Sequence, residues 1–149
     1  MSAGLSLKGL SVQSAILKDF IFTSANISKA DFRVAHCENA SFREAQAQDA
    51  DFRGAFLMNS DWTAAQGENI NFAGAKLTRA NFHLAKIQNC SFWGADLTQA
   101  DFSKANLKGC DLRNSILLYT QFHQAKYDKD TQFPASFPSG LKDEMIFEP

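Results

Sequence analysis

The chain has 149 residues, enough for one domain or one short array of repeats, and with 45% hydrophobic residues and only three prolines nothing marks it as disordered. Its 15 basic and 16 acidic residues give a net charge of -1, which argues against a basic surface for nucleic acid and against a strongly acidic one. Three cysteines without a CxxC pair fit neither a disulfide framework nor a zinc site, so a reducing cytoplasm is the expected location.

The N-terminal sequence MSAGLSLKGLSVQ lacks the charged start and the continuous apolar core of a secretory signal. The most apolar stretch, residues 16–22, contains Lys18 and Asp19 and is far too short to span a membrane. We therefore expect a soluble intracellular protein without a membrane partner.

A period of five residues starts at Leu7 and runs unbroken to Tyr127. Each repeat has a large central residue and, two positions earlier, a small one; 16 of the 21 alanines in the chain occupy this position between Ala15 and Ala125. In an α-helix the central residues would scatter around the axis, and in a flat strand an odd period would send every second one to the opposite face. The period instead predicts short extended pieces with two inward side chains, each followed by a two-residue corner.

Residues 1–24 are predicted to form an N-terminal cap and a degenerate first coil. Here the small position holds Leu5, Leu10 and Phe20 instead of alanine. An array of coils has two raw ends, and natural repeat proteins cover such ends because exposed strand edges and core side chains favour aggregation.

Residues 25–127 carry the motif A-[D/N]-[L/F]-x-x, which resembles the pentapeptide-repeat family. The resemblance implies an all-β fold, a right-handed quadrilateral β-helix with four repeats per coil and about six coils, capped at both ends. The Asp, Asn or Ser between the two inward positions is expected to bond nearby backbone groups at the corners. These carboxylates thus have a structural role that lowers their value as catalytic candidates.

Nine of the 14 phenylalanines, between Phe22 and Phe122, recur at multiples of ten, and Trp62 fills one gap. On a four-sided coil this places aromatic rings on two opposite walls, where rings one strand spacing apart, about 4.8 Å, can stack in offset fashion. Gly67 is expected to compensate for the large Trp62 in the packed interior.

The period ends after Tyr127, and residues 128–149 are predicted to be a C-terminal capping tail. Two Phe-Pro pairs are followed by the apolar residues of LKDEMIF, so a short helix is expected near residues 141–146.

No catalytic or metal-binding group of residues can be distinguished from the repeat pattern. Cys90 and Cys110 both take the small inward position, 20 residues apart, where a disulfide is conceivable but a role as apolar filler is favoured. His83 and His123 lie two coils apart on one wall, and no metal cluster follows. Without a phosphate loop, a nucleophile elbow or a cavity in a solid core, we predict no enzyme, no catalytic residue, no cofactor and no small-molecule substrate.

Any binding site is therefore expected on the outer surface. Arg33, Arg53 and Arg113 form a candidate charged wall, in which each arginine follows an aspartate by two residues; solvated charge pairs are favoured here over a ligand site. The outward apolar residues form a candidate interaction surface: Phe56, Met58, Trp93, Ile116, Leu118 and Tyr119. For the last three, cover by the returning tail is the favoured expectation, and an interface with a partner or in a homodimer is the alternative.

The leading hypothesis from this resemblance is a non-enzymatic bacterial scaffold that presents a rigid surface to another protein. The alternative follows from the quinolone-resistance members of the family, acidic dimeric rods that imitate duplex DNA and act on DNA gyrase. The near-neutral charge and the absence of a continuous acidic wall disfavour this alternative. Direct binding of nucleic acid is not expected.

Overall fold

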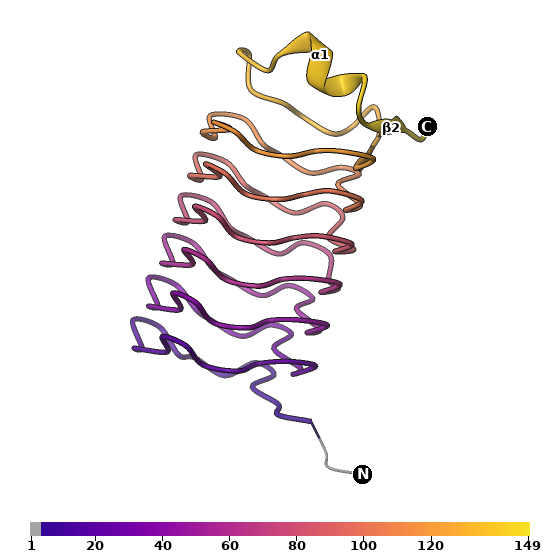
Figure 1. The fold of residues 1–149 in the computed structure, drawn as a ribbon. Helices are drawn as coiled ribbons and strands as arrows, with labels where there is room; N and C mark the ends of the chain where they lie inside the picture. The colour runs from indigo at the N-terminus through magenta and orange to yellow at the C-terminus, as the bar shows by residue number, and fades with distance from the viewer. Residues whose placement is uncertain (1–3) are drawn as a thin grey trace.

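The computed structural model describes residues 4–149 and shows a rod of stacked four-sided coils with the C-terminal tail at one end (Figure 1). Parallel bridges join residues 20 apart, from Ser6↔Asn26 to Asn106↔Lys126, in steps of five. Four pentapeptides therefore complete each coil. None of the helices in the described part of the chain has the length and apolar character to cross a membrane.

The four walls of the coil are named after one of their inward residues. Each wall is a column of central residues that repeat every 20 positions. The columns are the Phe22 wall (Phe22, Phe42, Trp62, Phe82, Phe102, Phe122), the Ile27 wall (Leu7, Ile27, Ala47, Gly67, Ile87, Leu107), the Phe32 wall (Val12, Phe32, Phe52, Phe72, Phe92, Leu112) and the Leu57 wall (Leu17, Cys37, Leu57, Leu77, Leu97, Leu117).

The corners depend on residues in the left-handed backbone region. Within residues 4–149, five glycines and 19 other residues have positive φ, between 55° and 60° for the non-glycine residues. Side chains from the preceding extended piece support these corners: Asp31 Oδ1 accepts the Arg33 N–H (3.0 Å), and Asn71 Oδ1 accepts the Ala73 N–H (3.0 Å). The predicted backbone bonds at the corners are thus confirmed, and they offset part of the cost of the left-handed residue.

The interior is built from two columns of aromatic rings, as predicted. Rings 20 residues apart stack nearly parallel, for example Phe72 and Phe92 with centroids 5.0 Å apart and planes at 8°. Rings 10 residues apart meet edge to face across the core, for example Phe72 and Phe82 at 5.7 Å and 84°. Both arrangements are favourable for aromatic quadrupoles, so each ring contacts its own wall and the opposite one.

Gly67 compensates for Ile70 rather than for Trp62, which corrects the sequence-based expectation. Ile70 takes the small inward position and is 1% exposed. A Cβ atom on Gly67 would lie 2.8 Å from the Ala47 carbonyl carbon and 3.0 Å from Ile70 Cδ1. The inward residues of this repeat have exchanged sizes, and Ile70 and the Ala47 backbone leave no room for a Cβ atom at Gly67. The indole N–H of Trp62 donates to Ser60 Oγ (3.0 Å) within its own repeat.

The first coil has the regular backbone of the later coils. Bridges such as Ser11↔Asp31 and Ile21↔Ser41 have the same spacing as those further along. Leu5 and Phe20 remain 42% and 44% exposed, and no part of residues 4–149 lies over this end of the rod (Figure 1). The part of the predicted N-terminal cap that falls on residues 1–3 lies outside the described residues.

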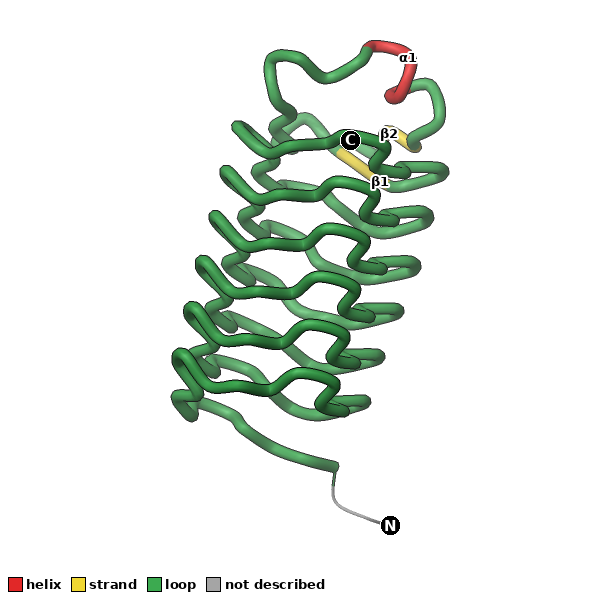
Figure 2. The backbone as a smooth tube through the Cα atoms, turned by 60° about the vertical axis from the view of Figure 1, so that its left-hand side comes forward, coloured by secondary structure: helices red, strands yellow, loops and turns green. Residues whose placement is uncertain are grey.

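The C-terminal tail turns back across the last coil. Strand β1 (Lys126–Tyr127) pairs in parallel with β2 (Ile146–Phe147), and between them lies the single turn of α1 (Ser139–Lys142), as Figure 2 shows. The helix lies earlier than the expected 141–146, because Ile146 is extended and donates its N–H to the Ala125 carbonyl. Glu148 then forms ion pairs with Lys108 and Lys126, both at 2.8 Å.

Candidate interaction surface

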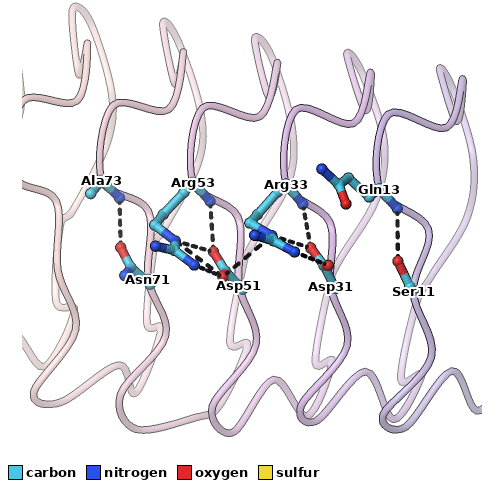
Figure 3. Close-up of polar contacts among 8 residues, drawn as sticks. All are labelled: Ser11, Gln13, Asp31, Arg33, Asp51, Arg53, Asn71 and Ala73. Carbon is cyan, nitrogen blue, oxygen red and sulfur yellow. Dashed lines mark hydrogen bonds and ion pairs between the residues drawn. The ribbon is translucent and has the colours of Figure 1, made fainter.

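The charged wall of Arg33, Arg53 and Arg113 is a row of internal ion pairs on the Phe32 wall. Each guanidinium lies 2.6–2.8 Å from the carboxylate two residues earlier. Arg33 also approaches Asp51 of the next coil at 3.8 Å, so the first two pairs form a ladder (Figure 3). The guanidinium groups donate their hydrogen bonds to carboxylates of the same protein. This geometry supports solvated charge pairs rather than an anion site.

These pairs predict a weakening of the fold in acid. The Arg113 guanidinium holds the pKa of the Asp111 carboxyl below its ordinary value, and Arg33 does the same for Asp31. A carboxylate with a lowered pKa in the folded state stabilises the protein fully above its unfolded pKa of 3.8, and this contribution is lost as the pH falls through the folded value. Thermal melts between about pH 7 and about pH 3 should show a falling Tm at the acid end.

The matched variant for this prediction is Asp31→Asn with Asp111→Asn. Asn71 and Asn106 hold the same position naturally and still accept the corner N–H (3.0 and 3.2 Å). We expect the double variant to lose less Tm between neutral and acid pH than the parent. Parallel Tm curves for the two proteins would show that the pairs contribute nothing measurable.

The six residues of the candidate interaction surface do not form one patch. Ile116, Leu118 and Tyr119 lie together on the last coil of the Leu57 wall, with exposed fractions of 54%, 55% and 73%; we call them the terminal apolar group. Phe56 and Met58 are on the same wall, three coils earlier along the bridge series, and both are half-buried.

The remaining apolar residues have local partners or lie apart. Phe56 stacks on His36, with ring centroids 4.4 Å apart and planes at 6°. Trp93 is 48% exposed on the Phe32 wall, around the corner from the terminal apolar group. Among the predicted residues, the structure therefore brings only the terminal apolar group together as an exposed cluster.

The tail does not cover the terminal apolar group, so the expectation of tail packing is wrong. The tail instead packs over the open end of the core, where the ring of Phe137 meets Phe122 edge to face at 5.7 Å. Between the tail and the Leu57 wall remains a cleft of about 210 Å³. Its lining is mostly apolar and consists of Ser115, Leu117, Leu118, Pro134, Ser136, Phe137 and Pro138.

The cysteines are buried free thiols. Cys110 Sγ donates to the Ile87 carbonyl (2.9 Å) and Cys90 Sγ to the Gln88 carbonyl (3.3 Å). Burial raises the pKa of the Cys37 thiol to about 12 and also raises that of Cys90. Such thiols are poor nucleophiles, and the geometry supports their role as small core residues.

Two surface features were not found by sequence reasoning. The first is a polar depression of about 370 Å³ on the Ile27 wall, lined by Gly67 and by glutamines such as Gln48 and Gln88. The sequence signal for this depression is a glycine at the central position of a repeat, combined with a large residue at the small position of the same repeat. The second is the open N-terminal end, signalled by Ile16 and Ile21 at positions that are mostly polar in later coils. No group of three metal-ligating side chains comes together in residues 4–149.

The fold and this surface define a solenoid of five-residue repeats with a packed interior. The family model for pentapeptide repeats matches eight copies in residues 21–59, 68–94 and 95–126. The chain therefore belongs to the pentapeptide-repeat family. The unmatched residues 60–67 contain the departures at Ser60 and Gly67.

Solved structures of the same family are similar to this chain. HetL, a pentapeptide repeat protein involved in heterocyst differentiation regulation in Nostoc sp. strain PCC 7120, has 18% identity and a TM-score of 0.53, covering 95% of this chain and 80% of HetL. Rfr23 from Cyanothece 51142 has 19% identity and a TM-score of 0.52, covering 86% of this chain and 90% of Rfr23. These likenesses show the fold alone, a right-handed β-helix.

QnrB1, a plasmid-mediated fluoroquinolone resistance protein, has 29% identity over 91% of this chain and 71% of its own. Its TM-score of 0.37 gives no structural argument for a shared function. A search among curated proteins found no significant match.

Proposed function

We propose that this protein is a non-enzymatic scaffold, a rod of about six coils that binds another protein through its C-terminal end. The binding surface consists of the terminal apolar group and the neighbouring cleft between the Leu57 wall and the tail. The same proposal places the protein in the cytoplasm, where its buried thiols stay reduced.

The observation that carries this proposal is the exposure of three large side chains beside an apolar cleft. Leu118 is 55% exposed and also lines the cleft, so the exposed group and the cleft form one continuous surface. The tail supplies Pro134, Phe137 and Pro138 to the other side of the cleft. An apolar side chain of a partner could enter there while its neighbours contact Ile116 and Tyr119, the arrangement typical of a hot spot at a protein interface.

The rest of the rod supports binding rather than catalysis. Its interior is filled by stacked rings, and its aspartates and asparagines are occupied at corners and in ion pairs. A rigid surface loses little conformational freedom when it binds, which favours affinity from a small contact area.

The test is affinity capture from lysate of the source cells with the protein as bait, comparing the parent with Leu118→Lys plus Tyr119→Lys. We expect a captured partner to be lost or weakened at least tenfold by the two lysines, because they place charge in the apolar contact. Gln88→Lys plus Asn89→Lys is the control, since these residues hold the same two repeat positions on the opposite wall. Equal loss in both variants, or in neither, would contradict the proposed surface.

The gyrase alternative is tested with the same proteins in a supercoiling assay. A DNA mimic needs rows of uncompensated carboxylates, whereas Asp31, Asp51 and Asp111 here are bonded to arginines. We expect no effect on supercoiling. A concentration-dependent effect that survives the Leu118 and Tyr119 changes would replace the scaffold proposal with gyrase modulation.

A further inference from the structure

The N-terminal end of the rod is an exposed apolar surface that the scaffold function does not use. Five residues of the first coil form it, and we call them the N-terminal face: Leu5 (42% exposed), Leu10 (53%), Ile16 (78%), Phe20 (44%) and Ile21 (71%). Large apolar side chains exposed at one end of a molecule often mark an interaction site.

At this end of the described chain, backbone N–H and C=O groups are left without partners at regular five-residue intervals. In a later coil, Asn26 donates its N–H to the Leu5 carbonyl (2.9 Å) and accepts the Leu7 N–H (2.8 Å), so both groups point toward the preceding coil. Ser6, Ser11, Ile16 and Ile21 hold the equivalent positions in the first coil. Within residues 4–149, neither the N–H nor the C=O of these four residues has a backbone partner. The edge thus offers four donor and acceptor pairs, one on each wall.

The other end of the rod is partly covered by the tail. The tail crosses the last coil, and Gln124 N–H and Ile146 N–H are both used in bonds between tail and coil. The tail therefore lies in the way of a head-to-tail contact between copies, which would build an open filament. The same edge on a second copy remains as a partner with matching backbone groups.

We propose that two copies of this chain associate through their N-terminal faces around a two-fold axis perpendicular to the rod. Facing coils then run in opposite directions. An antiparallel pair needs residues whose N–H and C=O both point across the gap, and Ser6, Ser11, Ile16 and Ile21 have this arrangement. The interface is isologous and closes as a dimer, which leaves no edge for further growth.

The winding of the coil fixes the register. The edge is a ramp that rises by one strand spacing, about 4.8 Å, per turn. It ends in a step where Gly4 lies beneath Ser24, whose carbonyl would be 3.4 Å from a Cβ atom at Gly4. The edges of two copies wind with the same handedness. They stay one strand spacing apart around the whole coil when the two-fold axis passes through the step. Ser11 then faces Ile16 of the second copy, and Ser6 faces Ile21 of the second copy.

The dimer gives the scaffold a second property. It places two terminal apolar groups at opposite ends of a doubled rod, so a partner with two binding sites would be held by both ends. The association itself does not depend on the proposed partner surface, because the two surfaces lie at opposite ends of the chain.

Sedimentation velocity over a range of concentrations tests the association. We expect the parent to be dimeric at micromolar concentration and Ile16→Lys plus Ile21→Lys to be monomeric, because lysines on an edge oppose pairing. The control is Ile116→Lys, since Ile116 holds the same position on the same wall in the last coil and is also exposed (54%). It should leave the dimer intact. Circular dichroism must show an unchanged fold for each variant that is compared.

Cross-linking tests the register. An oxidised mixture of Ser11→Cys and Ile16→Cys proteins should give a linked heterodimer, since facing antiparallel residues lie about 5.5 Å apart at Cα. Ser11→Cys alone should give far less linked dimer. A monomeric parent, a dimer that survives the Ile16 and Ile21 lysines, or a dimer lost with Ile116→Lys would each overturn the proposal.

Discussion

Replacing Phe72 with alanine is expected to lower the free energy of unfolding by about 3–5 kcal/mol. Phe72 is fully buried in the middle of the rod, and its ring contacts four others: Phe52 (5.3 Å), Trp62 (5.1 Å), Phe82 (5.7 Å) and Phe92 (5.0 Å). Truncation removes all these contacts at once. The backbone around the site is fixed by bridges to both neighbouring coils, so the cavity has little means of collapse.

Urea denaturation followed by circular dichroism and by tryptophan fluorescence measures this effect. Phe56→Ala is the matched control, since that ring is on the outer surface and stacks only on His36. It should cost a small fraction of the Phe72 value. Phe72→Leu should fall between them, because leucine already fills the same wall at Leu112 in the last coil. A Phe72→Ala protein that unfolds at the urea concentration of the parent would refute the stacked interior.

The second large effect is expected at Gly67 and Ile70, as a coupling between two changes. Ile70→Ala alone should cost about 2–5 kcal/mol, because it empties a site that is 1% exposed. Gly67→Leu alone should cost at least about 1–3 kcal/mol, because the Cβ would lie 2.8 Å from the Ala47 backbone and 3.0 Å from Ile70 Cδ1.

The double variant restores the usual repeat, with alanine at the small position and leucine at the centre. We expect it to be much more stable than the sum of the single changes predicts, with a coupling energy of about 1–3 kcal/mol from a double-mutant cycle. Gly74→Ala with Ile70→Ala is the control pair, since a Cβ at Gly74 meets no atom within 4 Å. Additive free energies for Gly67 and Ile70 would show that the two residues do not share the space.

Loss of the depression on the Ile27 wall gives a second readout of the same double variant. If the leucine at position 67 fills this wall as the central residues of other repeats do, the hollow of about 370 Å³ between residues such as Gln48 and Gln88 should become shallower. A structure of the variant would show whether the size exchange alone shapes this surface.

The regular part of the fold could be predicted from the sequence because its signal is repeated many times. The five-residue period excludes a helix and a flat strand on geometry alone, and the multiples of ten among the phenylalanines place the rings on two walls. The bonds from Asp31 and Asn71 to corner N–H groups follow from residue type and position. Each repeat confirms the others, so one irregular repeat does not change the prediction.

The ends and the irregular repeat could be decided only by the tertiary structure. Whether the tail covers Leu118 depends on the path of a non-repetitive segment, and pairing of Ile146 with Lys126 directs it over the core instead. The role of Gly67 depends on its close approach to Ile70 and to the Ala47 backbone, which composition does not reveal. The free edge at Ile16 and Ile21 has meaning only once it is known that no other part of residues 4–149 lies against it. A period describes what each coil shares with the next, whereas ends and exceptions depend on contacts that occur once.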